Sequence, residues 1–335
     1  MRPYQYRCKD YSLLTPPFKQ WVITPLIKIV PWAIPANIIT LISNCFVYLG
    51  LYLALNGAEV GPNYTRLYNY TPLYISACLL IYLIGDHLDG MQAKRTGTGS
   101  ALGEFCDHYL DAFNNGIVVY TMLVFFNVHQ PMIISSVIVI SYMAHMAVFY
   151  EQFKTGWLTF EKIGSLEGVL LSSIFIGLSV VDSFYALVTT PIFFDLSAAA
   201  IFIICSAIGA FSTFIQTFLR TPDVKAGYWF FIGLLLTLGI AGIFTLNDLQ
   251  LFTVLTLYAS HYIGKLMFGH LIDGLESQPD WIMPLALALY AIIGMNNPDY
   301  IFWIGSAYLA ARIMTLIVKT FSVLGIYWVW QNARV

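Results

Sequence analysis

Four aspartates, in two pairs 18 residues apart, are the residues of this chain best placed to do chemistry. Asp86 and Asp89 are separated by three positions, and Asp107 and Asp111 by four. On helices, both spacings put the paired side chains on one face, so two neighbouring helices can direct four carboxylates to one point. Carboxylates gathered in an apolar environment repel one another and need a cation to neutralise them. Such oxygen ligands select Mg²⁺, Mn²⁺ or Ca²⁺, and four negative charges balance two divalent ions.

The segment between the two pairs suits a phosphorylated substrate. Gly90 and Gly103 have no side chain, so a ligand can approach the backbone there. Lys94 and Arg95 can bind phosphate oxygens. Paired divalent ions beside such groups indicate in-line displacement at phosphorus, in which the ions hold the phosphates and stabilise the developing charge. The alternative is that the aspartates cap helices or face cytosolic water, but two glycines and two bases between four such spaced aspartates argue against it.

Long apolar runs must hold these residues in place. Hydrophobic residues make up 59% of the 335 residues and charged residues only 10%, and the mean hydropathy is +0.73. Soluble domains carry about 25% charged residues. The composition therefore predicts an all-α, polytopic membrane helix bundle, since backbone groups in lipid must be hydrogen-bonded within their own segment. The five cysteines form no CxxC pair, which indicates neither a disulfide framework nor a zinc site.

About ten transmembrane helices are expected. They cover residues 37–55, 71–88, 104–127, 131–150, 167–181, 196–219, 228–246, 249–271, 280–296 and 300–327. Residues 18–33 combine Trp21, Trp32 and two lysines with aliphatic residues, which is typical of a helix in the membrane interface. An amphipathic cap on the bundle is the alternative. The chain thus divides into a cytoplasmic arm with an interfacial helix at 1–35 and a membrane domain at 36–335.

The charges of the loops orient the bundle. With the N-terminus inside, twelve lysines and arginines fall on inside segments and only Arg66 on an outside segment. This asymmetry follows the positive-inside rule. Both termini and the connection 89–103 are therefore expected in the cytoplasm. Residues 182–195 are expected to form a loop with a partly interfacial piece, and the first 18 residues lack the apolar stretch of a signal peptide.

The acidic stretch resembles the signature of the CDP-alcohol phosphotransferase family, D-x2-D-G-x2-A-R-x8-G-x3-D-x3-D. The chain matches this signature at Asp86, Asp89, Gly90, Ala93, Gly103, Asp107 and Asp111. The family's arginine is replaced by Lys94, which lacks the planar fork that binds phosphate oxygens in pairs. Part of that role is expected to pass to Arg95, which follows directly.

Further runs are similar to the eukaryotic choline/ethanolamine phosphotransferase branch of this family. These runs are YQYRCKDYSLL (4–14), QAKRT (92–96), LGEFCDH (102–108), AHMAVFYE (144–151) and KLMFGH (265–270). Asn37 lies in PANIIT, close to the family's P-N-x-[IL]-T, and is expected to contact the nucleotide. The resemblance implies a multi-pass protein whose active site faces the cytoplasm, in the endoplasmic reticulum or Golgi of a eukaryote or the inner membrane of a bacterium.

The resemblance implies that phosphocholine or phosphoethanolamine passes from CDP-choline or CDP-ethanolamine to diacylglycerol, giving a phospholipid and CMP. Two Mg²⁺ or Mn²⁺ ions are expected on Asp86, Asp89, Asp107 and Asp111. His108 and Asp111 are the expected catalytic residues, with His108 taking the hydroxyl proton because imidazole titrates near neutral pH. The bilayer and a second copy of the chain are the other expected partners, and no nucleic-acid polymer is expected.

Several residues are expected to surround the substrate. The resemblance implies CDP or phosphate binding by Asn37, Asp86, Gly90, Ala93, Lys94, Arg95, Gly103 and Glu104. Glu104 would orient a metal ligand or hold the nucleotide. His145 is a candidate for lining the cavity, because histidines within membrane spans are costly and often functional.

Three other functions are compatible with acidic residues in a membrane. A CDP-diacylglycerol-dependent transfer to a polar alcohol shares the short signature, and only the wider branch likeness argues against it. An Asp-rich intramembrane prenyltransferase needs two acidic clusters far apart in sequence, whereas the aspartates after residue 111 are scattered. A divalent-cation transporter explains buried aspartates but not the glycines and bases between them.

Overall fold

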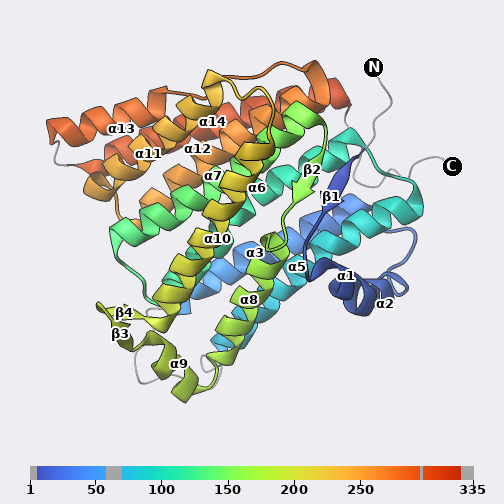
Figure 1. Ribbon diagram of the computed structural model, residues 1–335, viewed down its shortest axis with the longest axis horizontal. Coiled ribbons are helices and arrows are strands. Elements are labelled where there is room, and N and C mark those ends of the chain that lie inside the picture. The colour runs from blue at the N-terminus through green and yellow to red at the C-terminus, as the bar shows by residue number, and fades with distance from the viewer. Residues whose placement is uncertain (1–5, 58–69, 295–296, 326–335) are drawn as a thin grey trace.

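The computed structural model describes residues 6–57, 70–294 and 297–325, and most of these residues are helical (Figure 1). The long helices are α3 (Ala36–Gly57), α5 (Thr71–Thr96), α6 (Ala101–Phe125), α7 (Pro131–Thr155), α8 (Ser165–Leu178), α10 (Ala198–Arg220), α11 (Ala226–Thr245), α12 (Asp248–Phe268), α13 (Ile282–Ile293) and α14 (Pro298–Leu324). Each coincides with one of the ten expected spans. The prediction of an all-α membrane bundle is therefore confirmed.

Fewer helices qualify as spans when length and composition alone are counted. Among the described residues, α3, α5, α7, α10, α11 and α14 are long and apolar enough to cross a membrane. A seventh span results if α8 and the short helix α9 (Asp182–Thr189), which are bent by 118°, form one broken crossing. Helix α6 carries the acidic stretch, and α13 has only 12 residues. The count of ten is thus approximate.

Residues 182–195 differ from the loop that was expected. They contain α9 and a strand, β3 (Pro191–Phe193), which pairs antiparallel with β4 (Leu196–Ser197). Helix α9 forms here because Phe184 and Tyr185 pack against the core, on Phe175 and Phe126 respectively. The local sequence looked like a loop because its helix is only two turns long.

The segment expected to be helical at residues 18–33 is helical as far as Ile27, and turns follow up to α3. Helix α1 (Thr15–Phe18), the π-helical turn η1 (Lys19–Ile23) and α2 (Thr24–Ile27) follow one another without a break. Ile23 and Ile27 pack on Leu88 of α5, whereas Trp21 and Trp32 are exposed. One side of the segment therefore covers α5 and the other is exposed, and its place in the membrane interface stays a prediction.

Strand pairing and side-chain hydrogen bonds hold the N-terminal arm in place. Strand β1 (Cys8–Asp10) pairs in parallel with β2 (Leu158–Phe160), which follows α7, and the two strands lie side by side in Figure 1. Beyond β1, the Ser12 hydroxyl donates to Glu167 Oε1 at 2.5 Å and the Leu14 N–H donates to the same oxygen at 3.1 Å. The arm is thus anchored on β2 and on the first turn of α8.

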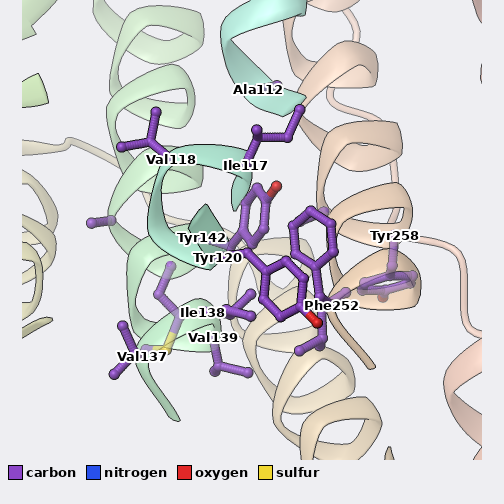
Figure 2. Close-up of a cluster of buried hydrophobic side chains, with 14 of the residues drawn as sticks. Ala112, Ile117, Val118, Tyr120, Val137, Ile138, Val139, Tyr142, Phe252 and Tyr258 are labelled. Atoms are coloured by element: carbon purple, nitrogen blue, oxygen red, sulfur yellow. The ribbon is translucent and has the colours of Figure 1, made fainter. Parts of the chain in front are cut away.

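The core joins α6, α7 and α12 through large aromatic side chains. The rings of Tyr120 (α6) and Phe252 (α12) are stacked at 4.2 Å, and Tyr142 and Tyr258 lie nearby (Figure 2). Closer to the acidic stretch, α3 packs tightly along α5. A Cβ atom on Gly85 would lie 2.2 Å from the Ser43 Cβ, so a glycine is required for this approach.

The acidic helices are joined by a short, well-defined connection. Helix α5 is capped at its C-terminal end by Gly97, whose φ of 65° is the left-handed conformation that glycine adopts most easily. Helix α6 is capped at its N-terminal end by Ser100, whose hydroxyl accepts the Gly103 N–H at 3.0 Å. The C-terminal end of α5 and the N-terminal end of α6 therefore lie together, and they bring the two aspartate pairs into one region.

Candidate metal centre

Three of the four aspartates converge between α5 and α6. Asp86, Asp107 and Asp111 each offer a carboxylate oxygen, and these oxygens lie within 4.8 Å of one another. All three side chains are partly buried. Three negative charges at this separation repel one another, and a divalent cation between them removes the repulsion. The carboxylates therefore fit a hard divalent ion, and the helical spacing of Asp107 and Asp111 leads both to the same point.

Asp89 lies beside this group, and the structure shows it turned toward α3. It is buried, and its Oδ2 accepts the Thr40 hydroxyl at 2.5 Å. It is not among the three side chains whose oxygens converge. Its role as a fourth metal ligand stays a prediction.

Asp111 is held from behind by two donors. Its Oδ1 accepts the Tyr82 hydroxyl at 2.7 Å and the Asn114 amide at 3.2 Å. Asn114 also donates to Asn44 of α3, at 2.6 Å. Sequence reasoning missed these supporting residues, although a signal existed. Tyr82 precedes Asp86 by four positions and Asn114 follows Asp111 by three, the same spacings that pair the aspartates.

His108 lies at the edge of the acidic group. The imidazole is buried, and its Nε2 is 3.8 Å from Asp107 Oδ2. Its Nδ1 finds no hydrogen-bond partner within residues 6–57, 70–294 and 297–325. Aromatic rings flank it, with Tyr6 of the arm at 5.7 Å and Phe149 of α7 at 5.9 Å between centroids. Tyr6 is a neighbour that the sequence did not reveal, because β-pairing far along the chain brings it there.

Two further predicted residues lie near His108. Glu104 is buried and accepts the Gln152 amide of α7 at 2.7 Å. His145 packs on the other side of Phe149, with ring centroids 5.1 Å apart. Its Nε2 is buried and unpaired in the part of the chain that the structure describes. The lining of a substrate cavity by His145 stays a prediction.

Lys94 and Arg95 differ sharply in their surroundings. The Lys94 side chain is exposed at the end of α5. Arg95 donates to the carbonyl oxygens of Ile27 (2.5 Å) and Val30 (2.7 Å), and its guanidinium lies 4.5 Å from the centre of the Trp32 ring. Arg95 thus ties α5 to the segment before α3. The geometry favours Lys94 over Arg95 as the group that meets a phosphate.

The remaining signature residues lie at the same end of the helices. Asn37 is in the first turn of α3, and its Oδ1 is 3.5 Å from where a Cβ on Gly103 would be. Gly90 is exposed, and Ala93 and Gly103 are partly buried. The ends of α3, α5 and α6 therefore present small residues and one amide beside the carboxylates.

Comparison with known proteins agrees with this arrangement. Residues 33–193 match the family model described as CDP-alcohol phosphatidyltransferase. These residues belong to the CDP-alcohol phosphatidyltransferase family. The matched range contains α3, α5 and α6 and therefore every aspartate of the candidate centre. Members of the family use divalent metals, which the converging carboxylates of Asp86, Asp107 and Asp111 fit.

Individual relatives in the family are similar over part of the chain. An uncharacterised class-I family protein of Schizosaccharomyces pombe is 30% identical over 186 residues, which are 50% of this chain and 44% of that protein. Choline/ethanolaminephosphotransferase 2 of Arabidopsis thaliana is 32% identical over 127 residues, 36% of this chain and 30% of its own. Cholinephosphotransferase 1 of Gallus gallus is 32% identical over 126 residues, 36% of this chain and 35% of its own. The chain thus matches less than half the length of each of these relatives.

Proposed function

We propose that this protein transfers phosphocholine or phosphoethanolamine from the CDP-linked donor to diacylglycerol and releases CMP. The observation that carries the proposal is the convergence of the Asp86, Asp107 and Asp111 carboxylates beside the buried imidazole of His108. The names of relatives as choline- and choline/ethanolaminephosphotransferases support an amino-alcohol donor. Those relatives are matched over less than half their length, so the identity of the substrates is part of this proposal.

The acidic residues supply the metal chemistry. Asp86, Asp89, Asp107 and Asp111 would hold two Mg²⁺ or Mn²⁺ ions, since four carboxylates balance two divalent charges. Such ions, when bound, stabilise the negative charge that develops on the diphosphate. Tyr82 and Asn114 fix the Asp111 carboxylate by donating to its Oδ1. The carboxylate is therefore oriented before the substrate arrives.

The remaining residues would bind the donor and move one proton. Lys94 binds a phosphate oxygen, and Gly90 and Gly103 leave room for the nucleotide. The diacylglycerol hydroxyl oxygen forms a bond to the phosphorus that carries the amino alcohol, and the bond from that phosphorus to the bridging oxygen breaks. CMP leaves with that oxygen, and the hydroxyl proton passes to His108, whose Nδ1 is unpaired among the described residues.

The decisive experiment is a transfer assay on the purified, full-length chain. Radiolabelled CDP-choline or CDP-ethanolamine is incubated with diacylglycerol, with Mg²⁺, with Mn²⁺ and after chelation. We expect CMP release and labelled phospholipid only when the metal is present. A parallel reaction contains CDP-diacylglycerol and polar alcohols instead. Product in that reaction alone would contradict the proposed donor and assign the chain to the phosphatidyl-transferring reaction.

We also propose that the site faces the cytoplasm of a multi-pass membrane protein. Lys94, Lys154 and Arg220 lie in the last turns of α5, α7 and α10, at the ends expected inside. A membrane-impermeant thiol reagent tests this orientation on a chain whose own cysteines are replaced and which carries Thr98→Cys as the reporter. In sealed right-side-out vesicles, labelling of the reporter only after the membrane is permeabilised supports the proposal. Labelling of intact vesicles would contradict it.

A further inference from the structure

Two asparagines outside the signature form a hydrogen bond behind the acidic group. Asn44 is on α3 and Asn114 is on α6, and both are buried, with exposed fractions of 6% and 1%. The Asn114 amide nitrogen donates to the Asn44 side-chain oxygen at 2.6 Å. A buried amide is costly unless it is hydrogen-bonded, so this pair has a definite geometric requirement.

Hydrogen bonds continue from this pair to both signature helices. On one side, Asn114 Nδ2 donates to Asp111 Oδ1 of α6 at 3.2 Å. On the other, Asn44 Nδ2 donates to the Thr40 carbonyl oxygen at 2.8 Å, and the Thr40 hydroxyl donates to Asp89 Oδ2 at 2.5 Å. These hydrogen bonds, joined through the covalent bonds of Thr40, therefore link Asp89 on α5, through α3, to Asp111 on α6.

Each bond of the path has a definite donor and acceptor. The Asn44 amide nitrogen donates to the Thr40 carbonyl oxygen, and the Asn44 side-chain oxygen accepts from Asn114. The Asn114 NH₂ group, which carries two hydrogens, donates to both Asn44 and Asp111. Every bond that reaches a carboxylate in this path therefore comes from a donor, which opposes the repulsion between aspartates on separate helices.

We propose that Asn44 and Asn114 are positioning residues for the metal centre. The hydrogen bond between their side-chain amides holds α3 against α6. It thereby aligns Asp111 and Asp89 before any ion binds. Neither asparagine needs to touch the ion or the substrate. Hydrogen bonds behind metal ligands typically change metal affinity about 10–100-fold when removed. The inference deepens the proposed function and rests on its metal centre.

Mn²⁺ binding to the purified full chain, without nucleotide or lipid, tests the inference directly. The electron paramagnetic resonance signal of free Mn²⁺ reports the dissociation constant for the wild type, Asn44→Leu, Asn114→Leu and the double variant. We expect each single substitution to raise the Kd about 10–100-fold. The double variant should be no weaker than the worse single variant, because both substitutions break one path.

A matched control lies next to Asn114. Asn115 is on the same helix, but its side-chain oxygen accepts the Ser141 hydroxyl of α7 at 2.9 Å. Asn115→Leu should leave the Mn²⁺ Kd unchanged. A tenfold loss in this control as well would mean that any polar deletion in α6 weakens metal binding, and it would overturn the specific role of the pair.

Kinetics separates positioning from a folding defect. In a positioning variant, raising the Mn²⁺ concentration restores kcat, and the KM for the nucleotide donor stays unchanged. A folding defect lowers kcat at every metal concentration. If Asn44→Leu shows such a defect, the Kd is measured again on Asn44→Ser, a smaller change whose side chain cannot reach Asn114. If Asn44→Ser and Asn114→Leu are properly folded and bind Mn²⁺ with normal affinity, the positioning role is overturned, while the proposed function stands. Absence of Mn²⁺ binding to the wild type overturns the metal chemistry of the proposed function instead.

Discussion

The imidazole of His108 combines burial, a flanking carboxylate and a nitrogen without a partner in the described chain. These features suit a group that accepts a proton from the acceptor hydroxyl. We expect His108→Ala to lower kcat about 10²–10⁴-fold, the usual contribution of a general base, while binding of the CDP-linked donor stays nearly intact. Equilibrium binding of labelled donor and steady-state kinetics measure the two effects. His129→Ala is the control, since His129 is an exposed histidine paired with Asp248. Near-normal kcat in His108→Ala would remove the base assignment.

Asp111 has a carboxylate that Tyr82 and Asn114 fix by donating to its Oδ1, and this carboxylate offers one oxygen to the group that it forms with Asp86 and Asp107. Asp111→Asn keeps the shape and removes one negative charge, so we expect transfer to be abolished while membrane insertion is normal. CMP release is measured together with the amount of protein in the membrane fraction. Asp182→Asn, in the first turn of α9, is the control and should retain activity. Substantial turnover by purified Asp111→Asn would refute the metal assignment.

At the scale of elements, the neighbouring residues Lys94 and Arg95 have different roles: Lys94 is expected to bind substrate phosphate, and Arg95 holds α5 to the segment before α3. Arg95 holds the carbonyls of Ile27 and Val30, so Arg95→Ala should lower the free energy of unfolding by about 1–3 kcal/mol, the cost of buried groups left unpaired. Lys94→Ala should raise the KM for the nucleotide donor and change stability by less than about 0.5 kcal/mol, because its side chain is exposed. Thermal unfolding and kinetics on both variants test the pair. An unchanged KM in Lys94→Ala together with a raised KM in Arg95→Ala would reverse the assignment.

The same elements show why part of the site was predictable. The spans follow from the length of apolar runs that a bilayer demands, and the meeting of Asp107 with Asp111 follows from their helical spacing. Asn44 and Thr40 were missed because their partners lie 70 and 49 residues away in sequence. Tyr6 was missed because it reaches His108 only through the pairing of β1 with β2, whose strands lie about 150 residues apart along the chain. Such contacts depend on how whole helices pack, which local patterns do not encode.

At the scale of the molecule, charged groups outside the spans join helices that are distant in sequence. Glu276, between η2 (Gly269–Asp273) and α13, accepts the Tyr150 hydroxyl at 2.8 Å and the Lys154 ammonium at 2.6 Å. Lys225, just before α11, lies 3.6 Å away. Burial alone would raise the pKa of Glu276, but the hydrogen bonds from Lys154 and Tyr150 and the lysine charges together lower it below its ordinary value of 4.5. The charged form of this carboxylate is therefore favoured by folding.

This shift has a definite sign for stability against pH. A carboxyl group whose pKa is lower in the folded protein contributes stability above its unfolded pKa and loses it as the pH falls through the folded value. Glu276→Gln should therefore unfold more readily than the wild type at pH 7, and the difference should shrink below about pH 4.5. Thermal unfolding of both proteins in detergent between pH 7 and pH 3.5 measures this difference. Asp273→Asn, three positions earlier and exposed, is the control that should match the wild type throughout. A difference between Glu276→Gln and the wild type that stays constant over this range would mean that the carboxylate charge does not join α7 to the segment before α13.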